Sequence, residues 1–333
     1  MNVKSYAKAG AALGAAALGL GILSAPASAD PNPTTDYRQL AGVGSDTTQY
    51  VVNGLGEVVT NASGKIVASW NATGTATVKT KATNCTITRP NGSSAGINAL
   101  NADLAAGTNC IDFARSSRGP ADTSTTDLTF IPFAKDGVTY ATDLGSTLPT
   151  NLTTAQLADI YKCTSTTYPN AQPLLPQSGS GTRSFWLAAI GITEAQVGSC
   201  VNQSVQEHDG IAIANGNQLM PYSIAQWIAQ GKGFADVPNR RGESRLRNIN
   251  GTAPTTGSGS SLALNTGFTA TFLRDVYNVV ESARLTGGTK ASPVLIETFE
   301  GSTSKVCAAS STITNYGFGT VSNCGSVALK AER

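Results

Sequence analysis

The chain has 333 residues, of which 13% are charged and 40% hydrophobic, and its formal net charge is +2. Nucleic acids and anionic membrane surfaces attract basic proteins, so this composition argues against both as partners. The length is enough for two domains or for one large domain.

The first 29 residues have the pattern of a secretory signal peptide. Lys4 and Lys8 form a basic start, an Ala/Gly/Leu stretch follows from about residue 9 to 23, and Ala27-Ser28-Ala29 resembles a cleavage site. The stretch is shorter than the roughly 18 apolar residues of a membrane span, so we expect cleavage after Ala29 and no membrane span in the mature chain. Removal of the two lysines lowers the net charge by two, to zero. No cysteine lies near the cleavage site, so we predict a secreted, extracellular protein without a lipid anchor.

Six cysteines are present, and an even number is typical of disulfide bonds in an exported protein. Many pairings are possible, and we predict that neighbours along the chain pair. A zinc site is the alternative, which the single histidine and the lack of a C-x-x-C motif disfavour, so we expect no metal and no cofactor. The predicted pairs are Cys85 with Cys110, Cys163 with Cys200, and Cys307 with Cys324.

The mature chain begins with a proline-rich, polar segment, residues 30–37, which we interpret as a flexible lead-in. A strand is predicted at Leu40–Val43, and the polar turn Gly44–Thr48 follows it. Apolar residues then recur at helical spacing from Val51 to Val59. The unit is therefore a strand, a polar turn and a helix.

The same unit returns at residues 176–190, and a third polar turn, 114–120, follows the short apolar stretch 111–113. Strands that alternate with helices predict α/β layers. Four further segments are expected: buried strands at 131–134 and 293–296, a helix at 272–280, and a loop or hinge at 252–261.

The turn Ser178–Arg183 has the composition of an anion site. The first N–H groups of a helix have no partner inside the helix and lie at the positive end of its dipole. Glycines let an anion approach the backbone, hydroxyls add donors, and Arg183 adds a charged donor. An ordinary helix cap is the alternative, because serine and threonine are favoured there in any protein.

Two other turns carry similar chemistry. The turn Gly44–Thr48 adds a carboxylate, Asp46, which either caps the helix or accepts a proton from an anion such as HPO₄²⁻. In the turn 114–120, Ser116 and Ser117 lie between two arginines, Arg115 and Arg118. Exposed arginines are usually solvated, so we expect at least one of them to lie outside any site.

Together, the three turns resemble, in order and spacing, those of the phosphate-binding proteins of phosphate ABC transporters, which have the periplasmic-binding-protein-like fold. Gly44-Ser45-Asp46-Thr47 resembles the family's first anion loop, and Ile111–Ser117 resembles the second. Ser178–Arg183 resembles the third, G-S-G-T. The stretch from His208–Ala212 through Met220–Ala225 resembles the family's N-D-G-I…I-G-Y-V segment.

The resemblance implies an α/β protein with the two-lobed, type 2 periplasmic-binding-protein-like fold, whose lobes close around a ligand in the cleft between them. Lobe 1 would combine residues 38–131 with 260–330, and lobe 2 would be 132–259. The implied ligand is a small oxyanion, with phosphate first, the implied partner is an ABC transporter permease, and we expect a monomer. The ligand-binding residues implied are Ser45, Asp46, Thr47, Ser116, Ser117, Ser180, Gly181, Thr182 and Arg183.

The chain departs from the family's pattern at two places. The acid that ends the family's second loop falls on Ser117, and the arginine and acid before G-S-G-T fall on Pro176 and Ser178. We interpret Asp46 as a replacement acceptor and Arg183 as a replacement cation. Sulfate, another tetrahedral anion and a phosphorylated organic solute therefore stay open beside phosphate.

Two other functions compete with anion binding. A serine hydrolase would use Ser180 as nucleophile and His208 as base, but the nucleophile elbow G-x-S-x-G fails at Ser178. We therefore expect no enzyme, and interpret His208 as a polar residue at a helix start. The second competitor is a secreted interaction protein that keeps the fold and has lost the anion.

Overall fold

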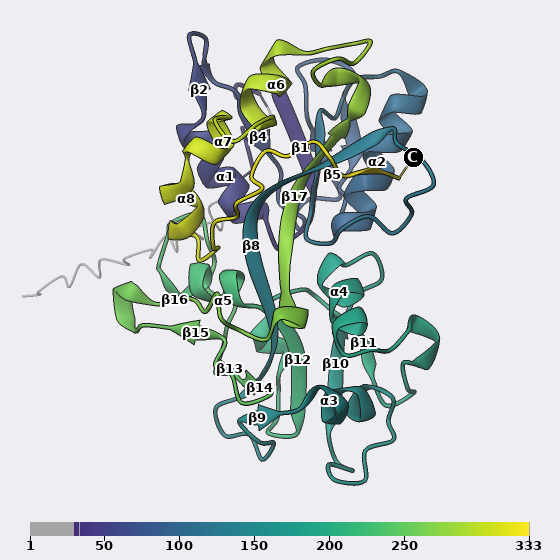
Figure 1. The fold of residues 1–333 in the computed structure, drawn as a ribbon, viewed down its shortest axis with the longest axis vertical. Helices are drawn as coiled ribbons and strands as arrows, with labels where there is room; N and C mark the ends of the chain where they lie inside the picture. Colours follow the sequence, from purple (N-terminus) through teal and green to yellow (C-terminus); the bar gives the residue numbers. More distant parts are fainter. Residues whose placement is uncertain (1–29, 33, 333) are drawn as a thin grey trace, which may run out of the picture.

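The computed structural model describes residues 30–32 and 34–332 (Figure 1). The predicted signal peptide, residues 1–29, lies outside the described residues. The segment predicted as a lead-in contacts the body of the protein through Asp30, which forms a 2.8 Å ion pair with Arg89 and accepts a hydrogen bond from the Asn71 amide. Within the described ranges, no helix is long and apolar enough to cross a membrane.

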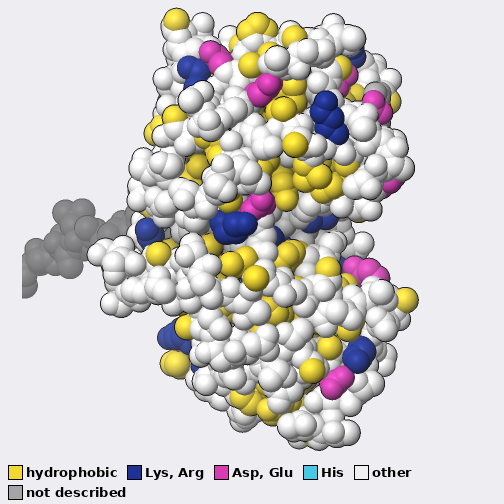
Figure 2. Space-filling model, in the orientation of Figure 1, with side chains coloured by type: hydrophobic (Ala, Val, Ile, Leu, Met, Phe, Trp, Pro, Cys, Tyr) yellow, Lys and Arg dark blue, Asp and Glu magenta, His cyan; other side chains and the backbone are white. Residues whose placement is uncertain are grey.

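Two lobes are joined by two long antiparallel strands, β8 (Leu128–Asp143) and β17 (Leu273–Glu281), which pass from one lobe to the other (Figure 1). The expected α/β, two-lobed architecture is thus confirmed. Charged side chains are few and scattered on the face that Figure 2 shows, in keeping with the low charged fraction of the sequence.

The upper lobe in Figure 1 packs helices around one half of the main sheet. Its sheet strands are β1 (Leu40–Gly44), β4 (Val67–Ser69), β7 (Phe113–Ser116) and β18 (Lys330–Ala331). Its helices are α1 (Gln49–Val58), α2 (Ser93–Ala106), α6 (Pro293–Phe299), α7 (Lys305–Ala308) and α8 (Ser310–Asn315). Small hairpins pair β2 (Thr60–Asn61) with β3 (Gly64–Lys65) and β5 (Thr77–Lys79) with β6 (Thr86–Thr88).

The lower lobe continues the same ten-stranded sheet. Its sheet strands are β10 (Gln172–Pro176), β11 (Asn202–Val205), β12 (Gln218–Ser223) and β13 (Ser244–Leu246). Its helices are α3 (Thr154–Tyr161), α4 (Gly181–Ala189) and α5 (Ile224–Gly231). Short pairs join β9 (Asn151–Leu152) with β14 (Asn248–Ile249) and β15 (Thr255–Thr256) with β16 (Ala263–Leu264).

The strand order places the polar turns at the boundary between the lobes. The order is β11-β10-β12-β8-β17-β7-β1-β4. β1 and β7 are parallel, with Gly44 opposite Arg115, so the turns that follow them start side by side. Ligands of open α/β sheets bind at the carboxyl ends of the strands, which makes this edge the place to look for a site.

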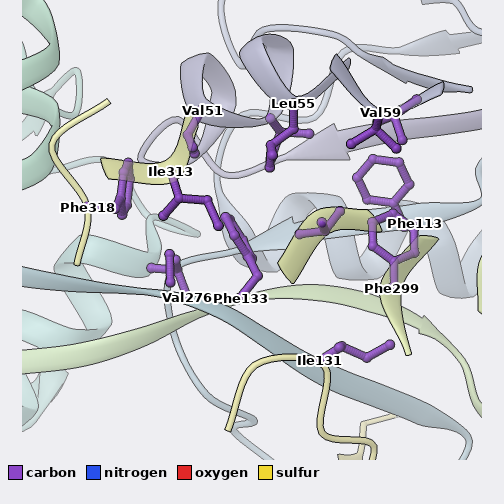
Figure 3. Packing of buried hydrophobic residues seen from close by; sticks show 14 of the residues in the cluster. Val51, Leu55, Val59, Phe113, Ile131, Phe133, Val276, Phe299, Ile313 and Phe318 are labelled. Carbon is purple, nitrogen blue, oxygen red and sulfur yellow. The ribbon is translucent and has the colours of Figure 1, made fainter. Parts of the chain in front are cut away.

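Each lobe has its own apolar core. In the upper lobe, Val51 and Leu55 of α1 pack toward Phe133 of β8 and Val276 of β17 (Figure 3). In the lower lobe, Val138 of β8 belongs to a second cluster with helices α3 and α4. Because β8 and β17 contribute to both cores, the proposed lobe boundaries near residues 131 and 260 stay a prediction.

The pairing of the two crossing strands is interrupted once. Val276 lies opposite Ala134, whereas the next residue, Tyr277, lies opposite Pro132, so Phe133 is an extra residue in β8. Proline has no amide hydrogen for the ladder and is tolerated in a central strand mainly at such bulges. The bulge therefore lies in the segment that joins the lobes.

Two of the predicted elements are wrong in type. Residues 293–296, expected as a strand, begin helix α6, because Ser292 caps the helix and Pro293 occupies its first turn. Residues 273–280 of the segment expected as a helix lie in β17, between β7 and β8, and Phe272 ends a short 3₁₀ turn before it. The apolar residues Leu273, Val276, Tyr277 and Val280 recur at a spacing that also fits a helix, which explains the error.

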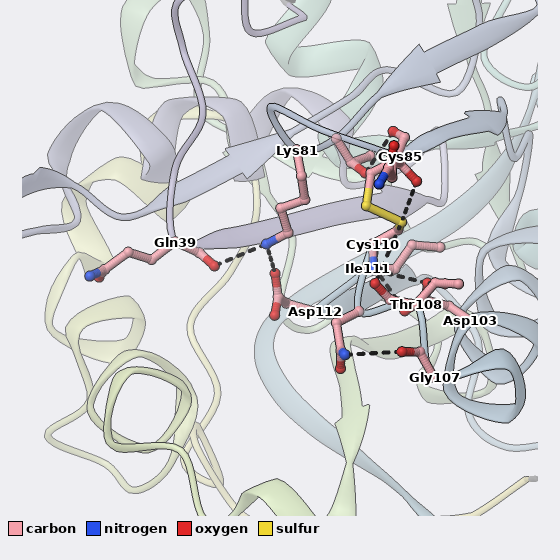
Figure 4. The surroundings of a disulfide bond; sticks show 12 residues. Gln39, Lys81, Cys85, Asp103, Gly107, Thr108, Cys110, Ile111 and Asp112 are labelled. Carbon is pink, nitrogen blue, oxygen red and sulfur yellow. Dashed lines mark hydrogen bonds and ion pairs between the residues drawn. A yellow bond between two sulfur atoms is a disulfide. The ribbon is translucent and has the colours of Figure 1, made fainter.

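The structure contains the three disulfides expected from the order of the cysteines. Cys85–Cys110 ties the β5–β6 hairpin to the segment before β7, close to the Lys81–Asp112 ion pair (Figure 4). The other two bridges are Cys163–Cys200 and Cys307–Cys324, and no described cysteine is free.

Replacing Cys163 and Cys200 together with alanine is expected to lower the free energy of unfolding by roughly 2–4 kcal/mol. The bridge spans 37 residues, and its removal frees a large loop in the unfolded state. The matched variant lacks Cys307–Cys324, which spans 17 residues, and should lose roughly 0.7 kcal/mol less. Urea unfolding of the three proteins measures both values, and an unchanged midpoint in the first variant contradicts the expectation.

Candidate functional site

Three hydroxyl groups from the three polar turns meet between the lobes. Thr47 Oγ1 lies 3.1 Å from Ser117 Oγ and 3.1 Å from Thr182 Oγ1, and all three residues are completely buried. Thr47 follows β1 and Ser117 follows β7, both strands of the upper lobe, whereas Thr182 lies in the first turn of α4, which Figure 1 shows in the lower lobe. The contacts therefore join one lobe to the other. With three further buried residues they form what we call the interlobe cluster: Thr47, Ser117, Thr182, Glu207, His208 and Arg274.

Two glycines make this close approach possible. Gly44 ends β1 with a φ of +119°, and a Cβ atom there would lie 2.8 Å from the Arg115 carbonyl oxygen. Gly181 begins α4 against the opposite lobe, where a Cβ atom would lie 2.5 Å from Ser117 Oγ. Ser180 caps α4 by accepting a hydrogen bond of 2.9 Å from the Arg183 amide. The first turn of α4 is thereby fixed against the upper lobe.

Arg274 supplies the positive charge of the interlobe cluster. Its guanidinium donates to Thr182 Oγ1 at 3.0 Å and to Thr47 Oγ1 at 3.4 Å. It also donates twice to the buried Asp136 carboxylate, at 2.8 and 3.1 Å. Arg274 in β17 lies directly opposite Asp136 in β8. No local motif points to Arg274, because only the pairing of strands distant in sequence brings it to the site.

His208 takes part as a hydrogen-bond donor. Its Nδ1 accepts a hydrogen bond from the Ser223 amide, so the ring hydrogen of a neutral imidazole is on Nε2. Nε2 lies 3.0 Å from Thr47 Oγ1. The backbone has a φ of +54°, and the carbonyl is held by Tyr222 Oη at 2.6 Å and Gln230 Nε2 at 2.9 Å. The surrounding structure thus holds an uncommon conformation that aims the ring at the cluster.

This geometry corrects the interpretation of His208 as a residue of a helix start. A short 3₁₀ turn, Gly210–Ala212, does follow and is capped by Asp209, but the His208 side chain lies in the interlobe cluster. It also argues against the hydrolase, because an Nε2 that carries hydrogen cannot accept a proton from a serine. Its hydroxyl neighbours are Thr47 and Thr182, neither of which is the required Ser180.

Glu207 is a completely buried acid beside these donors. Its Oε2 accepts from Thr47 Oγ1 at 3.4 Å and lies 3.5 Å from His208 Nε2. Burial acts to raise the pKa of Glu207, but hydrogen bonds from His208 and Ser180 and the charge of Arg274 outweigh it, so the pKa is lowered. Sequence reasoning missed this residue, since nothing in its neighbours along the chain signals complete burial.

Asp46 lies next to the interlobe cluster. Its carboxylate is 3.3 Å from the Arg240 guanidinium and accepts hydrogen bonds from Gln49 and Gln206. Burial raises the pKa of Asp46 against the pull of Arg240. Ser45 Oγ is buried and has no hydrogen-bond partner among the described residues. Asp46 therefore borders the contact between the lobes, through Gln206 and Arg240.

Two residues of the expected set point elsewhere. The Arg183 guanidinium forms a 2.6 Å ion pair with the exposed Glu194 and also donates to the Pro176 carbonyl. Ser116 Oγ donates to the Arg118 carbonyl at 2.8 Å. The structure thus does not bring Arg183 or Ser116 to the interlobe cluster. Ser93, at the start of α2, lies nearer: its hydroxyl accepts from the Ser117 amide at 3.0 Å.

The arginines of the second turn have structural partners. Arg115 is completely buried and donates to the carbonyls of Gly42, Gly44 and Ser45, which holds the first turn in place. Burial lowers the pKa of Arg115 to about 9. Arg118 forms a 2.8 Å ion pair with Glu332. In residues 30–32 and 34–332, no group of three or more His, Cys, Asp or Glu side chains is placed to hold a metal ion.

The architecture and the place of the interlobe cluster define the class of the protein. Two α/β lobes, joined by crossing strands and meeting at the carboxyl ends of parallel strands, form a type 2 periplasmic-binding-protein-like fold. A family model described as a PBP superfamily domain matches residues 31–265. The chain belongs to the PBP superfamily.

Solved structures with similar folds include several phosphate-binding proteins. An ABC-type phosphate transport receptor from Vibrio cholerae is 18% identical, with a TM-score of 0.55, over 85% of this chain and 100% of the receptor. A putative phosphate ABC transporter substrate-binding protein with bound phosphate, from Clostridium perfringens, is 14% identical, with a TM-score of 0.53, over 85% and 99%. A phosphate-binding protein from Stenotrophomonas maltophilia is 11% identical, with a TM-score of 0.51, over 86% and 92%. At these identities the likeness establishes the fold. No curated protein matches the chain in sequence.

Proposed function

We propose that the protein is an exported solute-binding protein, and not an enzyme, that binds a small oxyanion between its lobes. Phosphate is the first candidate, and an ABC transporter permease is the proposed recipient. The observation that carries the proposal is the convergence of three hydroxyls, the Arg274 guanidinium and the His208 Nε2–H on one buried point between the lobes. The names of the similar structures, which are phosphate receptors, support the choice of phosphate.

Binding at this point requires the lobes to separate first. The hydroxyl oxygens lie 3.1 Å apart and contact one another, which leaves no space for a tetrahedral anion among them. Separation also breaks the hydrogen bond of 2.7 Å from Gln226 Nε2 to the Thr47 carbonyl. We therefore propose a hinge motion of the two lobes, with closure around the anion.

The proposed donors can supply a useful affinity. We assign the donor roles to the residues predicted from the sequence, Ser45, Thr47, Ser117, Ser180, Gly181 and Thr182, and we assign to Arg274 the role predicted for Arg183, because Arg274 donates to Thr182 Oγ1. About four hydrogen bonds to a charged ligand, at roughly 1.5–3 kcal/mol each, bracket the roughly 8 kcal/mol of micromolar binding.

Calorimetry of the chain from Asp30 onward with phosphate, sulfate and arsenate tests the proposal. We expect saturable heat and a rise in melting temperature with phosphate. The competing function is a secreted interaction protein with the same fold. It is favoured if none of the three anions gives heat or a thermal shift.

Replacing Arg183 with glutamine is expected to change phosphate affinity less than about twofold. The guanidinium donates to Glu194, to Gln203 and to the Pro176 carbonyl, and none of its hydrogen bonds goes to the interlobe cluster, so the substitution removes no donor from the proposed site. Calorimetry of the variant beside the unmodified protein measures the ratio. A tenfold loss would show that Arg183 turns toward the anion during closure.

A further inference from the structure

Arg118, which directly follows Ser117 of the interlobe cluster, forms an ion pair that the proposed function does not use. Its partner is Glu332, in the segment after β18, and β18 pairs with β8 in the upper lobe. Both carboxylate oxygens of Glu332 accept from the Arg118 guanidinium, at 2.8 and 3.2 Å, and the two side chains are only 9% and 11% exposed. A paired bond of this kind fixes orientation as well as distance. Glu332 therefore determines where the Arg118 side chain lies.

Glu332 also holds the backbone that follows Arg118. Its Oε1 accepts hydrogen bonds from the Ala121 amide and, at 3.3 Å, from the Asp122 amide. The Glu332 amide in turn donates to the Asp122 carbonyl at 3.1 Å. One residue from a distant part of the chain is thus bonded to both the side chain and the backbone of the second polar turn and its continuation, residues 114–122.

The Arg118 guanidinium reaches the start of α2, which borders the interlobe cluster. Its Nε and Nη2 donate to Ser94 Oγ at 3.1 and 3.0 Å. The preceding residue, Ser93, accepts from the Ser117 amide at 3.0 Å, and its hydroxyl oxygen lies 3.3 Å from Ser117 Oγ. The Ser94 amide donates at 3.2 Å to the carbonyl of Gly179, in the turn before α4 of the lower lobe. Arg118 therefore joins the second polar turn to α2 at the point where α2 meets the lower lobe.

The hydroxyls of Ser93 and Ser117 lie against the first residue of α4, where the lobes meet. Both residues are completely buried. A Cβ atom on Gly181 would lie 2.2 Å from Ser93 Oγ and 2.5 Å from Ser117 Oγ. The N-terminus of a helix is the favoured place for an anion, so both hydroxyls are near the position that we propose for the ligand.

We propose that Glu332 is a positioning residue of the oxyanion site, and that through Arg118 it holds Ser93 and Ser117 where their hydroxyls donate to the anion. The inference rests on the proposed function and adds Ser93 to its donors. Groups that bind a ligand must be held to within about 0.5 Å of their working geometry by the residues around them. A carboxylate outside the site therefore sets the affinity for the anion without touching it.

Calorimetric titration of phosphate into the unmodified protein, Glu332→Gln, Arg118→Gln and the double variant tests the inference. Glutamine has the length of glutamate but replaces one acceptor oxygen with a donor, so the paired bond to the guanidinium is lost. We expect Glu332→Gln to bind phosphate roughly five- to twentyfold more weakly than the unmodified protein. Because Glu332 acts through Arg118, the double variant should bind about as well as Arg118→Gln alone.

Glu281→Gln is the matched control. The Glu281 side chain is 8% exposed and accepts from Lys290 at 3.0 Å, so the same change again removes a nearly buried, paired carboxylate from the upper lobe. Glu281 and Ala331 both pair with Leu128 of β8, which places the two glutamates near the same end of that strand. Lost stability alone does not change the affinity of molecules that remain folded. Glu281→Gln should therefore stay within about twofold of the unmodified protein in phosphate affinity when measured well below its melting temperature.

The outcomes separate the two proposals. If phosphate binds and Glu332→Gln matches Glu281→Gln in affinity, the inference is overturned and the proposed function stands. The same holds if the losses of Glu332→Gln and Arg118→Gln multiply in the double variant. If the unmodified protein binds none of phosphate, sulfate and arsenate, both are overturned. If Glu332→Gln does not fold, Ser94→Ala decides, because it removes the acceptor of Arg118 on α2: unchanged phosphate affinity overturns the inference, and a loss of about fivefold or more supports it.

Discussion

Replacing Arg274 with methionine is expected to lower the free energy of unfolding by about 3–5 kcal/mol. The variant leaves Asp136, which is completely buried, without its positive partner. It also removes the donor to Thr182 Oγ1 from the contact between the lobes. Urea unfolding near neutral pH, where Asp136 is charged in the unfolded chain, measures the loss.

Two controls separate the buried charge from other effects of the substitution. Arg245→Met removes a half-buried arginine that lies 3.8 Å from the exposed Glu243, and should cost less than about 1 kcal/mol. Adding Asp136→Asn to Arg274→Met removes the unpaired carboxylate and should restore part of the stability. The asparagine oxygen can still accept from Ser223 Oγ and from the Ala225 amide. If the single variant stays within about 1 kcal/mol of the unmodified protein, Arg274 does not offset a buried charge on Asp136 as described.

Replacing Thr47 with valine is expected to weaken phosphate binding by roughly 10- to 150-fold. Thr47 Oγ1 is the atom on which Ser117, Thr182, His208 and Arg274 converge, so it is placed to bond the anion directly. Valine keeps the shape of threonine and removes only the hydroxyl. Calorimetry with phosphate gives the ratio of dissociation constants.

The next residue along the chain provides the matched control. Thr48 is also completely buried, and its hydroxyl has no hydrogen-bond partner among the described residues. Thr48→Val should therefore leave phosphate affinity unchanged and should raise stability, because it removes an unsatisfied buried polar group. Equal losses of affinity in both variants would point to a disturbed turn and not to a lost bond from Thr47.

The contacts that could be predicted from the sequence are those that depend on local chemistry. Small polar turns between strands and helices lie at the carboxyl ends of the strands, and this rule alone brings Thr47, Ser117 and Thr182 together. Arg183 shows the limit of the rule. Successive residues of a helix point about 100° apart, so a residue next to Thr182 faces away from it and finds Glu194.

The residues that were missed depend on contacts between distant parts of the chain. Arg274 reaches the interlobe cluster because β17 pairs with β8 in the register that sets it against Asp136. That register cannot be predicted from a segment whose apolar spacing fits a helix as well as a buried strand. Glu207 and His208 reach the cluster because Tyr222 and Gln230 hold the His208 carbonyl. Those bonds join residues that only the folded lobe brings together.

The bulge at Phe133 has a mechanical consequence. Two paired strands resist bending where every backbone hydrogen bond between them is formed. They bend more easily at a bulge, where the hydrogen-bond ladder is interrupted. The unpaired Phe133 interrupts the ladder three residues before Asp136, which forms the ion pair with Arg274. A hinge at this bulge would then lie close, along β8, to the ion pair between Asp136 and Arg274 in the segment that joins the lobes. A small rotation about the bulge would move the lower lobe as a whole. The Arg274 guanidinium, which lies close to the rotation axis, would move little.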